Sequence, residues 1–191
     1  MIKIIKDKDP IWDVDDFEVI LLGTSTYNLL SGGFQSKLKH KLPLIEEYND
    51  KTKYADKSKI GTRLTVPCEP IVSLMYICNY PRPNEESVDY EALKRCLLTA
   101  NAEFKGKKAL TTIVGSSIFD GCGDKDKCLS IIEECTNDLD LTVYDYEQKK
   151  RQEEIKEQRK YLRSLQYTDV KKYELLKGMF DSYLKKLYLN G

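Results

Sequence analysis

The sequence predicts a three-layer α/β/α fold with a mixed sheet, followed by a C-terminal helical extension. Apolar segments typical of strands alternate with helical segments up to about residue 146. Two of those segments, residues 17–23 and 108–115, are apolar at consecutive positions, as strands covered on both faces are. From residue 147 the sequence becomes highly charged and helical. We therefore expect a functional domain at residues 1–146 and a helical hairpin or tail at 147–191.

The elements of the domain follow from their patterns. The segment 31–48 has a helical pattern that Pro43 breaks or restarts, because proline has no backbone N–H to continue a helix. Ser87, with Tyr90 and Glu91 close behind, predicts a helix start within 82–104. The remaining predictions are an edge strand at 2–5, a polar surface loop at 49–61, a strand pair at 62–66 and 70–80, a loop at 116–124, a helix at 125–138 and a last strand at 139–146.

Composition and charge narrow the classes of function. The chain has 31 Lys and Arg against 31 Asp and Glu, so it has no global attraction to nucleic acid or anionic lipid. No run of about 18 apolar residues predicts a membrane span, and no signal peptide is visible. The six cysteines form no CxxC pair, which indicates reduced thiols of a cytoplasmic protein. A compact, lysine-rich chain of this kind suits a virus or phage, in which case the location is the host cytoplasm.

Two predicted strands each lead into a loop of glycine and hydroxyl residues. The first loop is GTSTYN at 23–28, continuing to SGGF at 31–34, and the second is GSSIFDG at 115–121. In open α/β sheets, ligands bind beyond the carboxyl ends of the strands, and glycine amides with a helix N-terminus can hold phosphate oxygens. Two such loops suit a diphosphate. The alternative, that the glycines and hydroxyls only make turns, stays open for either loop alone.

The order of elements resembles that of the macro domain family, the ADP-ribose-binding α/β/α module, across residues 1–146. KDKDP at 6–10 stands where macro domains have Gly-Asp and an apolar residue, and IVGSSIFDG at 113–121 stands where the second loop of the family holds diphosphate and distal ribose. CLSIIEECTNDLDLTVYDY at 128–146 is similar to a divergent branch of the family. That branch includes the terminal ADP-ribose protein glycohydrolase and the ADP-ribose 1″-phosphate phosphatases.

The resemblance implies a set of ligand-binding residues: Asp9, Thr24, Ser25, Ser31, Gly32, Gly33, Phe34, Gly115, Ser116, Ser117, Ile118 and Phe119. In it Asp9 accepts a hydrogen bond from the adenine amino group, Thr24 and Ser25 line the ribose side, and residues 31–34 wrap the diphosphate. Residues 115–119 close over the other side, and the Phe119 ring covers the distal ribose. Asp9 as a turn residue before Pro10, and Phe119 as ordinary core, are equal alternatives.

The resemblance also implies that Asp120 is the catalytic residue, because the glycohydrolase branch has an acidic residue in this second loop, near the anomeric carbon. A carboxylate near the anomeric carbon can act as general base, nucleophile or stabiliser of an oxocarbenium-like state. The second loop is one residue longer here than in the glycohydrolase branch. Cys78, Asn79 and Tyr80 stand where that branch has its catalytic lysine, so its covalent lysyl mechanism is not expected. Hydrolysis through Asp120 stays open.

The predicted function is therefore binding of ADP-ribose or a derivative, with hydrolysis of ADP-ribose 1″-phosphate or of an ADP-ribosyl linkage. The rival is a catalytically silent reader or adaptor of ADP-ribosylated partners; a scaffold whose loops bind nothing is a third reading. We expect no cofactor, no metal, no membrane contact and no nucleic-acid partner. An amphipathic stripe in 170–189 has to be buried against the domain, a second copy or another partner, so a homodimer through the C-terminal helices is one expectation.

Overall fold

The computed structural model of the chain describes residues 2–30, 33–81, 85–117, 120–145 and 177. Its centre is a six-stranded sheet of order β1-β6-β5-β2-β4-β3. Neighbouring strands are parallel except at one edge, where β3 is antiparallel to β4. The strands are β1 (Lys3–Lys6), β2 (Val19–Ser25), β3 (Arg63–Val66), β4 (Ile71–Cys78), β5 (Lys108–Thr112) and β6 (Asp140–Asp145).

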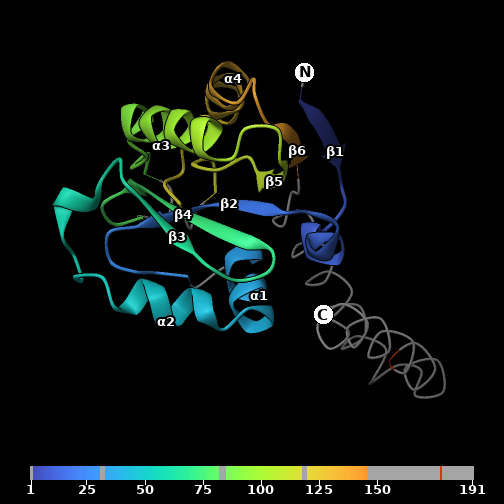
Figure 1. Cartoon of the computed structure of the whole chain (residues 1–191). Helices are drawn as coiled ribbons and strands as arrows, with labels where there is room; N and C mark the ends of the chain where they lie inside the picture. The colour runs from blue at the N-terminus through green and yellow to red at the C-terminus, as the bar shows by residue number, and fades with distance from the viewer. Residues whose placement is uncertain (1, 31–32, 82–84, 118–119, 146–176, 178–191) are drawn as a thin grey trace, which may run out of the picture. The chain divides into compact units, whose positions relative to one another are not determined.

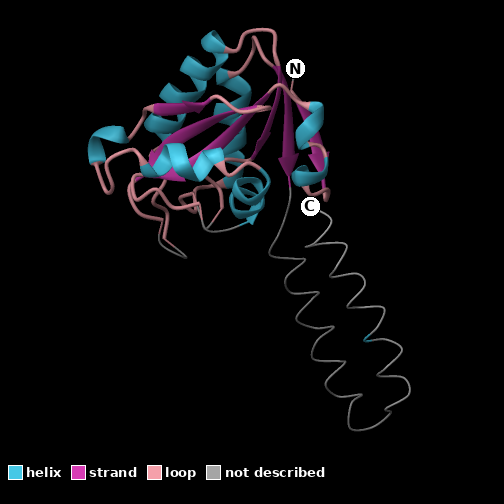
Figure 2. Cartoon of the chain, turned by 60° about the horizontal axis from the view of Figure 1, so that its bottom comes forward, coloured by secondary structure: helices cyan, strands magenta, loops and turns pink. Residues whose placement is uncertain are grey.

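Helices cover both faces of the sheet (Figures 1 and 2). One face is covered by α3 (Tyr90–Glu103) and α4 (Lys125–Cys135), whose buried side chains pack on alternate residues of β2 and β4 such as Leu21 and Ile77. The other is covered by α1 (Gly33–Lys41) and α2 (Leu44–Asp50), which pack on the intervening residues such as Leu22 and Leu74. The described unit also has three short 3-10 helices, η1 (Pro10–Trp12), η2 (Val14–Asp16) and η3 (Lys57–Lys59). The predicted α/β/α fold with a mixed sheet is confirmed.

The sheet changes direction of winding at β2. After β2 the chain forms β3 and β4 on one side of β2. It then crosses to the other side and forms β5. β2 is parallel to β5 with Leu21 opposite Thr111, so the loops that follow both strands begin at the same edge of the sheet. Such a switch point is where open α/β sheets place their ligands.

Local capping chemistry explains where the predicted helices begin. Pro43 separates α1 from α2, as predicted. The predicted start signal at Ser87 is wrong. α3 begins at Tyr90, because the Asp89 carboxylate accepts a hydrogen bond from Ala92 N at 2.8 Å and caps the helix. Ser87 N and Val88 N instead donate to Gly121 O, which fastens this segment to the second loop.

The chain divides into two units, residues 1–146 and 147–191. Apart from Lys177, the second unit lies outside the described residues. The predicted helical hairpin or tail at 147–191, and the homodimer through it, therefore stay predictions.

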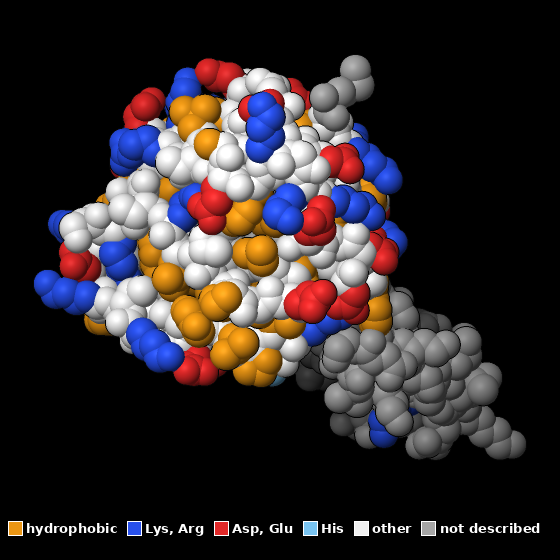
Figure 3. Space-filling view, in the orientation of Figure 1, with side chains coloured by type: hydrophobic (Ala, Val, Ile, Leu, Met, Phe, Trp, Pro, Cys, Tyr) orange, Lys and Arg blue, Asp and Glu red, His pale blue; other side chains and the backbone are white. Residues whose placement is uncertain are grey.

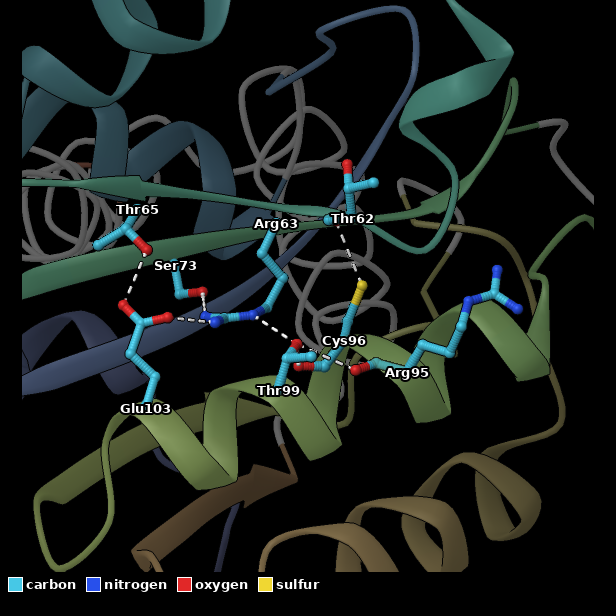
Figure 4. Close-up of polar contacts among 8 residues, drawn as sticks. All are labelled: Thr62, Arg63, Thr65, Ser73, Arg95, Cys96, Thr99 and Glu103. Carbon is cyan, nitrogen blue, oxygen red and sulfur yellow. Dashed lines mark hydrogen bonds and ion pairs between the residues drawn. The ribbon is translucent and has the colours of Figure 1, made fainter.

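Arg63 fastens the edge strand β3 to the sheet and to α3 (Figure 4). Its guanidinium donates to Ser73 Oγ at 2.7 Å and to Thr99 Oγ1 at 2.9 Å, and it pairs with the Glu103 carboxylate. The side chain is 9% exposed, and its guanidinium carbon lies 5.5 Å from the centroid of the Phe104 ring. One residue thus satisfies three polar groups from two elements, and the five donors of the planar guanidinium allow this.

Replacing Arg63 by Met is expected to lower the free energy of unfolding by about 2 kcal/mol, because the buried Ser73 hydroxyl loses its donor and the Glu103 carboxylate its partner. Urea unfolding followed by circular dichroism measures the change. Lys94→Met is the matched control: it breaks an ion pair with Glu134 in which both side chains are exposed, so stability should not change measurably. Equal losses in the two variants would contradict the role given to Arg63.

Candidate functional site

The loops after β2 and β5 meet at one edge of the sheet. The side chain of Asp120, in the second loop, lies directly over Gly23 of β2. A Cβ placed on Gly23 would lie 3.1 Å from Asp120 Oδ2 and 3.0 Å from the Ile77 side chain. Glycine at this position therefore lets the Asp120 and Ile77 side chains approach the backbone of β2 closely. The sequence predicted that the loops follow core strands, and the structure brings them side by side.

Two buried polar atoms, one at the end of β2 and one in the first turn of α1, have no hydrogen-bond partner among the described residues. Thr24 donates from its hydroxyl to Leu29 O at 3.1 Å, so this side chain is used within the loop. Ser25 is fully buried, and its Oγ has no hydrogen-bond partner among the described residues. Gln35 of α1 donates from Nε2 to Gly23 O at 2.6 Å, while its buried Oε1 is also unpartnered among those residues. Unpaired buried polar atoms are rare and destabilising, so each one calls for a physical explanation, and a bound molecule that completes the hydrogen bonding is one.

The first turn of α1 follows this loop. Gly33 begins the helix with a φ of 56°, and the N–H groups of a first helical turn have no partner inside the helix. The Phe34 side chain is buried in the core between α1 and the sheet, so only its backbone can face a ligand. Ser31 and Gly32 lie outside the described residues. The predicted wrapping of a diphosphate by residues 31–34 stays a prediction.

The second loop is stabilised by hydrogen bonds between its own residues, one of which is accepted by Asp120. Ser117 N donates to Asp120 Oδ1 at 2.8 Å, Ser116 Oγ donates to Ile113 O at 2.6 Å, and Gly123 N donates to Gly115 O at 2.7 Å. These groups are occupied within the loop, so their predicted contact with a ligand would require exchange of partners. Ile118 and Phe119 lie outside the described residues, and the predictions for them stay predictions.

The Asp120 carboxyl is 4% exposed. Burial raises the pKa of this carboxyl to about 6, although hydrogen bonds from the backbone of Gly115 and from Ser117 favour the charged form. A carboxyl that titrates near neutral pH can exchange a proton with a reacting group under ordinary conditions.

The cysteines beside Asp120 are not activated nucleophiles. Burial raises the pKa of Cys78 to about 12, and the charge of Asp120 adds to the effect. Burial raises the pKa of Cys128 to about 12 in the same way. Both thiols are therefore protonated at neutral pH, and a thiol is a far weaker nucleophile than a thiolate.

Asp9 lies at the N-terminus of η1 and is 3% exposed. Its Oδ1 accepts from Ile11 N at 3.2 Å, and its Oδ2 forms an ion pair with Lys37 of α1. The ion pair fastens η1 to α1. Both carboxylate oxygens thus have protein partners, and the predicted contact of Asp9 with adenine stays a prediction.

Gln35 was not predicted as a site residue. It stands in a basic helical segment, SGGFQSKLKHK, where a lone glutamine gives no signal of burial. The only available signal was its place two residues after the Gly-Gly pair, in the first turn of a helix that begins at a candidate ligand loop. His40 in the same helix is exposed, with Nδ1 2.6 Å from Ser36 O.

The described residues contain no group of three His, Cys, Asp or Glu side chains placed to hold a metal ion. None of the described helices is long and apolar enough to cross a membrane. On the face drawn in Figure 3, lysine and arginine side chains are interspersed with aspartate and glutamate, so the described part of that face has no large patch of one sign.

No protein-family model matches the sequence, and no curated protein matches it either. Solved structures do match. A protein of unknown function from Bacteroides thetaiotaomicron has a TM-score of 0.59 at 21% identity, over 76% of this chain and 98% of that one. A macrodomain protein from Streptomyces coelicolor has a TM-score of 0.55 at 17% identity, over 77% and 100%. DarTG of Thermosipho africanus, in complex with ADP-ribose, has a TM-score of 0.56 at 9% identity, over 74% and 41%.

The α/β unit thus has the macrodomain fold. The identities are low, so this likeness concerns the fold, and function has to be argued from the site.

Proposed function

We propose that the α/β unit binds ADP-ribose or a derivative of it at the edge of the sheet where the loops after β2 and β5 meet. The observation that carries this proposal is a pair of buried polar atoms that have no hydrogen-bond partner among the described residues, Ser25 Oγ in β2 and Gln35 Oε1 in the adjacent first turn of α1. A ligand with ribose hydroxyl groups offers the donors that would complete both. The macrodomain fold supports the same ligand, since one solved structure that shares the fold holds ADP-ribose.

The diphosphate of the ligand would bind at the first turn of α1. The first turn of α1 begins at Gly33 and is tied to β2 by the hydrogen bond from Gln35 to Gly23 O, and the N-terminus of a helix favours negative charge. The hydroxyl groups of the ligand and its diphosphate would thus be bound by adjacent parts of one loop, residues 23–35.

Replacing Ser25 by Ala tests the proposal. We expect the affinity for ADP-ribose, measured by titration calorimetry, to fall about tenfold, because the ligand loses a buried hydrogen bond. The free energy of unfolding should stay the same or rise, because without ligand the hydroxyl has no partner in the part of the chain that the structure describes.

Ser130→Ala, which removes an exposed hydroxyl from α4, is the control and should alter neither quantity. No binding of ADP-ribose to the wild-type chain at millimolar concentration would overturn the proposed function. Unchanged affinity in Ser25→Ala would overturn the assignment of the site.

Hydrolysis is the second candidate, and the specific observation in its favour is the buried Asp120 carboxyl at the junction of the two loops, with its pKa near neutral pH. In this mechanism Asp120 takes a proton from the attacking water, or stabilises positive charge at the anomeric carbon. Incubation with ADP-ribose 1″-phosphate and with ADP-ribosylated protein, followed by measurement of released phosphate and ADP-ribose, separates the two candidates. A silent reader binds ADP-ribose and releases neither product.

A further inference from the structure

Asn28, in the middle of the first loop, is held by Asn49 of α2 and by the segment that follows α2. It has a φ of 57°, a conformation that asparagine tolerates better than most residues. Its Nδ2 donates to Asn49 O at 3.0 Å and to Thr52 O at 3.2 Å, and Thr52 Oγ1 donates to its Oδ1 at 3.2 Å. Asn49 Nδ2 donates back to Asn28 O at 3.0 Å. Every polar atom of the Asn28 side chain is therefore used to fix the loop.

The same segment brings a lysine to this loop. Lys59, the last residue of η3, directs its ammonium at Asn28 Oδ1 and donates to Thr52 Oγ1 at 3.1 Å. The ammonium also lies 4.6 Å from the centroid of the Tyr76 ring, a cation–π contact with β4. Contacts with the first loop, with Thr52 and with the Tyr76 ring of β4 thus fix the position of the Lys59 amine.

Among the described residues, no carboxylate contacts the ammonium of Lys59. All of its contacts among the described residues are to neutral groups, and Asp56 acts on it only at longer range. Burial lowers the pKa of Lys59 below the ordinary lysine value of 10.5, which Asp56 partly offsets. Most other lysines of the unit, such as Lys37 and Lys41, are paired with aspartate or glutamate. A half-buried cation held by neutral groups is the arrangement that favours an anion nearby.

We propose that Lys59 determines the charge specificity of the site, holding Asn28 in place and favouring ligands that carry a diphosphate over the corresponding uncharged nucleoside. In the sequence Asn28 lies between Ser25, whose hydroxyl is proposed to contact the ligand, and Gly33, where the first turn of α1 begins. The inference rests on the proposed function, and it names a residue from outside both predicted loops.

Replacing Lys59 by Met removes the charge and keeps most of the length of the side chain. We expect the affinity for ADP-ribose to fall about tenfold, while the affinity for adenosine, which has no phosphate, changes less than twofold. Lys59→Arg keeps the charge and should restore most of the affinity for ADP-ribose. Lys57→Met, in the same 3-10 helix and exposed, should leave both affinities unchanged.

A merely structural lysine would give a different result. Equal losses for ADP-ribose and adenosine in Lys59→Met, or failure of Lys59→Arg to restore binding, would overturn the proposal. Wild-type protein that binds neither ligand would instead overturn the proposed function, so the two failures are distinguishable. Thermal unfolding of each variant shows whether a loss of binding comes from loss of the fold.

A pH titration adds an independent measurement. As the pH rises, Lys59 loses its proton, so the preference of the wild-type protein for ADP-ribose over adenosine should decline. Because the pKa of Lys59 is lowered, this decline should occur below pH 10.5, and Lys59→Met should lack it. The titratable groups facing the amine are Asp56, which is charged throughout this range, and Tyr76, whose pKa is raised by burial. Identical pH profiles for the wild-type protein and Lys59→Met would contradict the proposal.

Discussion

Replacing Asp120 by Asn is expected to change the pH dependence of stability by about 3 kcal/mol between pH 4 and pH 8. The pKa of this carboxyl is about 6 in the folded protein, against an ordinary value of 3.8. A difference of about two pKa units corresponds to about 3 kcal/mol. Because the folded pKa is the higher one, the carboxyl favours folding fully below pH 3.8, and that contribution is lost as the pH rises through 6. An asparagine does not titrate, so the variant lacks this loss.

Urea unfolding of both proteins at pH 4 and pH 8 measures the effect. The free energy of unfolding of Asp120→Asn minus that of the wild-type protein should be more favourable to the variant at pH 8 than at pH 4. Subtracting the wild-type value from the variant value at each pH cancels the titration of the other groups, and comparing the result at the two pH values isolates the titration of Asp120. This comparison also cancels any constant cost of placing an amide where Gly115 and Ser117 donate.

Asp13→Asn provides a control of opposite sign. Burial raises the pKa of Asp13, but hydrogen bonds from Lys8 and Tyr144 outweigh it and hold the pKa below 3.8. The Asp13 carboxylate therefore favours folding above pH 3.8, and this contribution is lost as the pH falls. Parallel pH profiles for the wild-type protein and Asp120→Asn would show that burial does not raise the pKa of Asp120.

A destabilising charge at neutral pH is retained in a protein when it has a use. If Asp120 carries hydrolysis, Asp120→Asn gains stability at pH 8 and loses turnover together, the trade-off expected of a catalytic group. A silent reader would show the gain in stability and, having no turnover, nothing to lose.

The sequence predicted the layers of the fold because each strand and helix has a local pattern. Consecutive apolar residues in β2 and β5 identified central strands, and the glycine and hydroxyl loops after them then had to share an edge once the strands were parallel and adjacent. Pro43 gave the break between α1 and α2 for a similarly local reason. The start of α3 was missed because Ser87 and Asp89 are both good capping residues, and the choice between them depends on Gly121, which is distant in the sequence.

The supporting contacts of the site have no such local signal. The 49–61 segment was predicted as a polar surface loop, and nothing in its composition separates Lys59 from the exposed Lys57. Its role depends on Asn28, 31 residues away, and on the Tyr76 ring beneath it. The direction of the Asp120 side chain, over Gly23, likewise follows from packing between strands. Sequence patterns therefore located the loops, while long-range contacts decide which of their atoms are available to a ligand.

Replacing Gly121 by Ala is expected to lower the free energy of unfolding by about 3 kcal/mol or more. Gly121 has a φ of 133°, which side chains rarely allow, and an added Cβ would lie 2.7 Å from Val88 Cβ and 2.8 Å from Val88 N. The backbone cannot move away easily, because Gly121 O accepts from Ser87 N at 2.7 Å and from Val88 N at 3.0 Å. The alanine methyl group would therefore separate the second loop from the segment that leads into α3.

Gly106→Ala separates the steric part of this effect from the conformational part. Gly106 also has a positive φ, of 76°, but an added Cβ would meet no atom within 4 Å. Gly106→Ala should lower the free energy of unfolding by only about 1 kcal/mol, which is the strain of a left-handed conformation. Urea unfolding of the two variants, with affinity for ADP-ribose measured on each, tests the argument. Because Asp120 precedes Gly121, the loss of affinity should accompany Gly121→Ala alone. Equal destabilisation by the two alanines would mean that the contact between the second loop and Val88 is not what holds this side of the site.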